Sequence, residues 1–188
     1  MRTATGTIWG RLNRRRRALG RDERGVTAVE FGLLALPFFT IIAAILQTSL
    51  VFLADQVLES AVHDAARAIR TGQAQEAGFT IDNFRADVCG RLYGLFSDCG
   101  GLHVRVSEIG TFRAASVAVP VEEECEGPCE WSIPERWTPG EGRSVILVQV
   151  FYRYPVPISL GPFGMANLPD GTRLLGSSAV FQNEPFSG

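Results

Sequence analysis

Lysine is missing from this 188-residue chain, and all 18 of its basic residues are arginines. Schiff-base and P-loop chemistry, which depend on lysine, are therefore excluded. Histidine is almost as scarce, because only His63 and His103 are present and they fall on different predicted elements. The G-x-S-x-G, H-E-x-x-H and G-x-G-x-x-G patterns are missing too. We therefore expect a protein that is not an enzyme and that holds no cofactor and no metal ion.

Charged residues are missing from a long internal run, residues 31–54. As a helix, this run spans about 36 Å at about 1.5 Å per residue, more than the roughly 30 Å of a bilayer's hydrocarbon core. It is longer than the apolar region of a secretory signal, and no clear A-x-A cleavage site follows it. A buried core helix is the alternative, but so long an uncharged run favours a transmembrane helix, which we assign to residues 26–54.

Acidic residues are scarce before this run and abundant after it. Residues 1–25 carry eight arginines and two acids, a formal charge of +6, and the remainder carries −8. The run Arg14 to Arg17 could bind nucleic acid, but no interleaved aromatic residues or nucleic-acid fold accompany it. Basic residues just before an apolar run are typical of a cytoplasmic anchor. We therefore expect no nucleic-acid partner, a cytoplasmic leader over 1–25, and a periplasmic location for everything after the membrane segment.

The helix is predicted to continue past the membrane as a stem over residues 55–70. One apolar face follows helical spacing, and its members are Leu58, Val62, Ala65 and Ile69. Another face carries Glu59, His63 and Arg67 at i, i+4 spacing, where His63 is expected to be a solvated side chain. The prediction is one helix over residues 31–70, ended by Thr71-Gly72.

Residues 71–188 form the predicted outer domain. A helical pattern begins the segment 79–96, and the alternation of Leu102, Val104 and Val106 with polar residues predicts a half-buried strand with His103 on its exposed side. Further strands are predicted at 112–119, 144–154 and 172–182. Helices followed by strands indicate an α+β fold in which a long N-terminal helix precedes a small domain with a helix and an antiparallel sheet.

All four cysteines, Cys89, Cys99, Cys125 and Cys129, follow the membrane segment. An even number in an oxidising compartment favours two disulfides. Four cysteines allow three pairings, of which we favour the two local ones, Cys89 with Cys99 and Cys125 with Cys129. A zinc site is the alternative, but both histidines lie elsewhere and the paired ligand spacing of such sites is missing.

The stretch Gly25-Val26-Thr27-Ala28-Val29-Glu30-Phe31 joins the basic leader to the apolar run. It resembles the prepilin peptidase site of type IV pilins, most closely in the tight-adherence (Tad, Flp) branch. Other parts are similar to TadE-like pseudopilins: Ala65-Ala66-Arg67, residues 84–89 with the second cysteine Cys99, SVILVQVFYRYP, and the closing FQNEPF. The resemblance covers nearly the whole chain, and a major Flp pilin is far shorter.

This resemblance implies that a prepilin peptidase removes the leader by cleaving after Gly25. Val26 then becomes the first residue, Glu30 the fifth, and Phe31 follows it. A carboxylate at membrane depth is costly unless it is paired. The new α-amine of Val26, with a reference pKa of about 8, is largely cationic at neutral pH and can pair with Glu30 within or between subunits.

The function implied is that of a minor pseudopilin in the biogenesis of an adhesive Tad pilus. Implied partners are the peptidase, the other pilins and pseudopilins, and inner-membrane assembly proteins. The implied location is the bacterial inner membrane, crossed once, with entry into the pilus open. A TadF-like or TadG-like relative also stays open. Two other functions are considered, an unprocessed membrane-tethered binding or sensor module and a periplasmic hydrolase.

Overall fold

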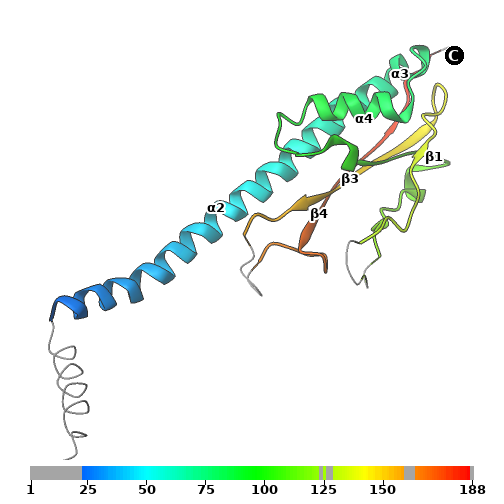
Figure 1. Cartoon of the computed structure of the whole chain (residues 1–188). Coiled ribbons are helices and arrows are strands. Elements are labelled where there is room, and N and C mark those ends of the chain that lie inside the picture. The colour runs from blue at the N-terminus through cyan, green and yellow to red at the C-terminus, as the bar shows by residue number, and fades with distance from the viewer. Residues whose placement is uncertain (1–22, 123–124, 126–128, 159–163, 187–188) are drawn as a thin grey trace, which may run out of the picture. The chain divides into compact units, whose positions relative to one another are not determined.

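The computed structural model describes residues 23–122, 125, 129–158 and 164–186. The chain divides into two compact units, Met1–Ile45 and Leu46–Gly188. Helix α2 (Glu23–Arg70) contributes to both, and the remaining described elements belong to the second unit. Figure 1 shows this order along the chain. The leader prediction for residues 1–22 lies outside the described residues.

Helix α2 begins earlier than the sequence predicted and runs without interruption through Pro37. Residues 55–70 are helical, and the apolar face of Leu58, Val62 and Ile69 in this part of α2 is completely buried. The helix ends at Arg70, directly before the predicted stop at Thr71-Gly72, and the backbone of Gly72 adopts the left-handed conformation with a φ of 82°. A Cβ at Gly72 would lie 2.7 Å from the ring of Phe186, so both the backbone and the packing require glycine there.

The second unit contains a four-stranded sheet with the order β2-β1-β3-β4. Its strands are β1 (His103–Ile109), β2 (Arg136–Trp137), β3 (Val145–Pro155) and β4 (Thr172–Gln182). β3 pairs antiparallel with both β1 and β4, whereas β2 is parallel to β1. The α+β class is confirmed, and the predicted antiparallel sheet is in fact mixed, because the chain reaches β2 through a long crossover that brings it back in the direction of β1.

Strand β3 lies at the centre of the second unit and is buried on both faces. Ile146, Val148 and Val150 point into the main core, while Leu147 and Phe151 on the opposite face are also buried. A strand covered on both faces reads as a continuous apolar run, which explains why this strand was the clearest in the sequence.

The main core lies between the sheet and two helices, α2 and α4 (Ile81–Gly90). Thr80 caps α4 through a reciprocal capping box with Asn83. Two short helices complete this layer, α3 (Gln73–Glu76) and the 3₁₀ turn η1 (Cys99–Gly101). The helices therefore cover one face of the sheet.

The strand predicted at 112–119 is wrong. The structure forms a short 3₁₀ turn, η2 (Phe112–Ala114), followed by residues without regular structure. Phe112, Val117 and Val119 are exposed. Apolar, β-branched residues favour a strand only where a neighbouring strand offers backbone groups and a packing surface, and no described strand lies beside this segment.

Candidate functional site

The structure places every residue of the predicted processing site on the first turns of α2. Val26 and Phe31 are 53% and 70% exposed, and Glu30 is also exposed. Val26 and Glu30 are four residues apart, so they lie on one face of the helix and one turn apart. Because helical side chains lean towards the N-terminus, the Glu30 carboxylate is directed towards the turn that contains Val26.

Neither the backbone conformation of Gly25 nor the packing around it requires a glycine. Its backbone is not left-handed, and a Cβ at this position would meet no atom within 4 Å. Alanine inside a helix is more favourable than glycine by about 1 kcal/mol. The described chain therefore has room for a side chain at Gly25, as it has at Gly32, and packing within the chain explains neither glycine.

The part of α2 after this site is apolar and exposed. It is the one helix of the described residues that is long and apolar enough to cross a membrane, and its most apolar stretch is not buried at all. The large exposed side chains between Phe31 and Ile45 are Phe31, Leu33, Leu34, Leu36, Phe38, Phe39, Ile41, Ile42 and Ile45. A surface of this kind fits a single-pass membrane helix.

The burial of α2 changes at Gln47. No described side chain from Gly25 to Leu46 is buried, whereas Gln47, Val51 and Ala54 are. Val51 and Ala54 belong to the core of the second unit. The stretch in which lipid can surround the helix on all sides therefore ends near Leu46, within the predicted transmembrane segment 26–54.

Both disulfides join the local pairs favoured by the sequence analysis. Cys89 on α4 is joined to Cys99 on η1, with Cα atoms 5.7 Å apart, and Cys125 is joined to Cys129 at 5.3 Å. The first bridge links the end of α4 to the turn before β1. The second closes a small loop at the start of the segment that leads to β2.

His103 was predicted to be exposed, and this is wrong, because the side chain is only 4% exposed. The Trp131 ring stacks on the imidazole with centroids 4.2 Å apart, and the Arg153 guanidinium lies 5.1 Å from the centre of the Trp131 ring. Arg153 also donates a hydrogen bond to the carbonyl of Cys129. These contacts hold the segment around Trp131 against the polar face of β1, which a strand pattern alone could not reveal.

A second polar cluster lies beside this stack. Arg85 donates hydrogen bonds to both oxygens of Glu135, at 2.8 and 2.9 Å, and to the Leu102 carbonyl at 3.2 Å. Burial by itself would lower the pKa of the Arg85 guanidinium. The hydrogen bonds and charges of Glu135 and Asp82 have the larger combined effect, so the pKa is raised. The ion pairs connect α4 to the residue before β2, so they serve to position these elements.

The His103 imidazole is held neutral by its surroundings. Burial lowers its pKa, although the Glu135 carboxylate, 4.0 Å from Nδ1, opposes that shift. Its Nε2 atom has no hydrogen-bond partner among the described residues. Its contacts with the Trp131 ring and the Glu135 carboxylate place the imidazole in the packing between β1 and the segment around Trp131.

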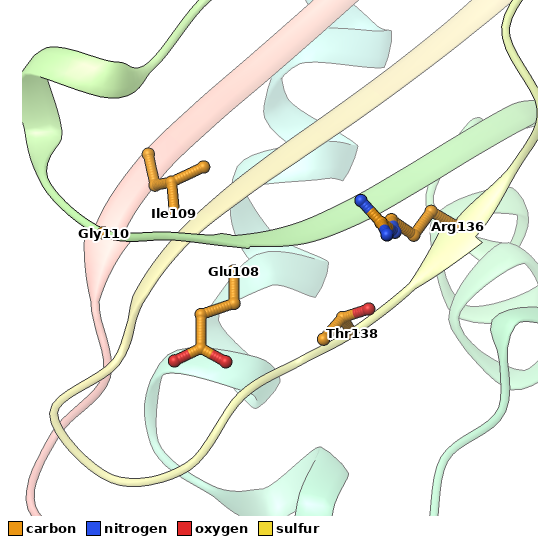
Figure 2. A pocket seen from close by; sticks show the side chains of 5 residues that line it. All are labelled: Glu108, Ile109, Gly110, Arg136 and Thr138. Carbon is orange, nitrogen blue, oxygen red and sulfur yellow. The ribbon is translucent and has the colours of Figure 1, made fainter.

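One hollow lies at the edge of the sheet and has a volume of about 450 Å³. Figure 2 shows Glu108 and Ile109 at one end of it and Arg136 and Thr138 at the other. The Glu108 carboxylate accepts a hydrogen bond from the Ser144 hydroxyl at 2.6 Å. The lining of this hollow contains one carboxylate, Glu108, and one guanidinium, Arg136.

The closing motif Asn183-Glu184-Pro185-Phe186 has a structural role. The buried Asn183 amide donates to the carbonyls of Pro139 and Glu141, at 3.0 and 2.9 Å. The backbone N–H of Glu184 donates to the last helical carbonyl of α2, that of Arg70, at 2.8 Å. The motif therefore fastens the end of the chain to the end of the stem and to the loop before β3.

Comparison with known proteins connects the exposed helix to a family. Residues 25–67 match the model of the family described as TadE-like protein. The match begins at Gly25, includes Glu30, and ends inside α2, which confirms the resemblance found in the sequence. No curated protein matches the chain, and no solved structure does. The outer domain lies outside the matched region.

Proposed function

We propose that this protein, whose residues 25–67 match the TadE-like family, is a minor pseudopilin of the Tad pilus system. In this proposal a prepilin peptidase hydrolyses the bond between Gly25 and Val26. The leader leaves with the new carboxylate on Gly25, and the mature chain keeps the new amine on Val26. The mature protein then acts in assembly of the pilus and carries out no catalysis of its own.

The observation that carries the proposal is the TadE-like match, which begins at Gly25 and includes the exposed Glu30. A peptidase must bring catalytic groups close to an extended backbone, and a residue without a side chain permits that approach. Glycine also weakens the first turn of α2 by about 1 kcal/mol relative to alanine, which favours its opening. A need that arises in the peptidase complex explains a glycine that the folded chain does not need.

Glu30 has a defined purpose once the chain is cut. Residues four apart in a helix are separated by about 6 Å along the axis, and the Glu30 side chain leans back over that distance. The cationic amine of Val26 can then meet the carboxylate in the same subunit or in a neighbour. Pairing offsets the cost of holding both charges away from water in lipid or in a helical bundle.

The proposed topology follows from the same helix. The arginine-rich leader stays in the cytoplasm under the positive-inside rule, α2 crosses the inner membrane once, and the outer domain folds in the periplasm. Its two disulfides suit an oxidising compartment. The burial of Gln47 supports a membrane-crossing part that ends near Leu46.

The cleavage step is tested with the variant Gly25→Leu and the matched control Gly32→Leu. Both glycines lie in α2, and neither would place a Cβ within 4 Å of another atom. In cells with an active prepilin peptidase, the intact mass should show a retained leader for Gly25→Leu and a shortened chain for the control. Equal processing of the two variants would remove the support that Gly25 gives to the proposal.

The assembly step is tested with Glu30→Gln, which removes the charge but keeps the shape. We expect near-normal cleavage and loss of most pilus assembly, measured as surface pilin sheared from cells. Glu59→Gln, an equally conservative change at an exposed position further along α2, is the control and should assemble normally. Normal piliation by Glu30→Gln would favour the unprocessed binding or sensor module instead.

A further inference from the structure

The two edges of the sheet differ in how readily they could pair with a strand of another chain. On one side β2 has two residues, and a strand this short offers little to a partner. On the other side β4 has eleven residues, all in unbroken register with β3, and it is the last strand of the described sheet. The start of its outer edge is covered, because the backbone N–H of Leu174 donates to the Asn167 side chain and the Thr172 carbonyl accepts from the backbone of Asn167 and Leu168, so the available part of the edge is 176–182. Arg173 is its one charged residue, and it contains no proline. Natural proteins block long edge strands with charges, prolines or bulges, so an edge without them is suited to pair with another strand.

A groove runs between this edge strand and the stem of α2. It has a volume of about 310 Å³ and is lined by His63, Ala66, Arg67, Arg70, Ala179, Val180 and Phe181. The helical side of the groove therefore presents two arginines and a histidine, and the strand side presents backbone and apolar side chains. No acidic residue is among these described lining residues.

The cations are only partly neutralised by the chain itself. Arg70 is 3.6 Å from the Glu184 carboxylate, and both groups are about half exposed. Arg67 is exposed and has no carboxylate within ion-pair distance among the described residues. A partner that brings carboxylates to this row would gain attraction without displacing an existing ion pair of Arg67.

We propose that β4 and the row of His63, Arg67 and Arg70 bind an acidic, extended segment of another protein. The segment adds to the sheet as a further strand, with its backbone bonded to β4 and its carboxylates directed to the arginines. Strand addition supplies affinity through main-chain hydrogen bonds and specificity through alternate side chains. The inference rests on the second unit alone and does not depend on cleavage after Gly25.

A second copy of this chain fits the edge poorly. Antiparallel pairing of two β4 strands about their central residue, Ser177, would set Arg173 of one copy opposite Phe181 of the other. Phe181 lines the groove next to Arg67 and Arg70, so that arrangement would bring like charges together. Charge complementarity therefore selects an acidic partner and disfavours a homodimer.

The test uses the full-length chain in detergent micelles and two synthetic ten-residue peptides. One peptide alternates valine with glutamate, and the other alternates valine with lysine. Measured by fluorescence polarisation, the glutamate peptide should bind at least about tenfold more tightly than the lysine peptide. Hydrogen exchange should show added protection over residues 176–182 of β4 when it binds.

Charge-reversal variants complete the test. Arg67→Glu should lower the affinity for the glutamate peptide by about tenfold. Arg113→Glu, a charge reversal at an exposed arginine on η2, should leave that affinity unchanged. Equal binding of both peptides, binding of neither at millimolar concentration, or protection confined to other elements would overturn the proposal. A homodimer in light scattering that excludes the peptide would also overturn it, because the second copy would then be the occupant.

Discussion

Helix α2 has two halves, residues 23–45 and 46–70, which contain similar apolar residues but differ in whether those residues are buried. Before Ile45 the leucines are exposed, as Leu34 at 73% illustrates, whereas Leu58 in the second half is 0% exposed. The second half loses water by packing on its own sheet and on α4. The first half has no such partner in the described chain, so its apolar surface is suited to lipid or to other helices.

This difference separates two kinds of stability within one helix. Changes in the second half should act on the folding of Leu46–Gly188, and changes in the first half should act on membrane insertion and assembly. Two pairs of measurements test that separation and two more test the second unit by itself, in order of decreasing expected effect.

The largest effect is expected from Leu58→Ala compared with Leu34→Ala. Removing a fully buried leucine side chain costs about 2–5 kcal/mol, because both apolar burial and packing are lost. The exposed Leu34 makes no comparable contacts in the described structure, so its truncation should leave the free energy of unfolding of the outer domain unchanged. Chemical denaturation followed by tryptophan fluorescence measures both. Equal destabilisation would show that the halves are not separate.

A charge in the first half should affect insertion. Leu34→Arg places an arginine within the apolar stretch, at a cost of about 3 kcal/mol if that stretch is at the centre of the bilayer. His63→Arg is the control, because it adds a fixed charge to an exposed position of the stem. The membrane-integrated fraction after alkaline extraction should fall for Leu34→Arg alone. Full integration of Leu34→Arg would argue against a membrane location for this stretch.

Loss of either disulfide should lower the stability of the second unit only. Loss of the bridge between Cys89 and Cys99, which spans 10 residues, should cost about 2.7 kcal/mol in the chain-entropy model. The bridge between Cys125 and Cys129 spans 4 residues, and its loss should cost about 2 kcal/mol. Double Cys→Ala variants, compared in urea titrations, test this order. The reverse order would show that enthalpic contacts outweigh loop entropy.

The smallest effect concerns pH. Burial lowers the pKa of His103 in the folded state, so the neutral ring favours folding. That contribution is present above the unfolded pKa of about 6.5 and is lost as the pH falls through the folded value. Stability should therefore decrease between pH 7 and pH 5, by at most about 1.4 kcal/mol per pH unit. His103→Gln should flatten this decrease in urea midpoints, and an unchanged slope would show that other groups cause it.

The helix and the strongest strands could be predicted because their patterns are local. The buried stem face, both disulfide pairs and β4, at its full bounds, agree with the structure. Spacing along one element is sufficient for such predictions, because burial on one face imposes the period. The proposed processing site is also local, since its residues lie within two turns of α2, and cleavage there stays a prediction.

The errors arise where burial depends on residues far apart in the chain. His103 reads as exposed from its strand alternation, but Trp131, from a loop, covers it. The segment 112–119 has strand-forming residues but no neighbouring strand. The parallel direction of β2 depends on a crossover that two residues of strand cannot signal. Only the aromatic Trp131 in a loop rich in turn residues hinted that this loop packs against the sheet.

The most direct test of the account is the N-terminal residue of the mature chain. Protein extracted from the membranes of cells with an active prepilin peptidase should begin at Val26, with Glu30 as its fifth residue, when analysed by N-terminal sequencing and intact mass. The same chain from cells without the peptidase should keep its leader. A chain that keeps its leader in piliated, peptidase-competent cells would contradict the account, because the amine that pairs with Glu30 would never be formed.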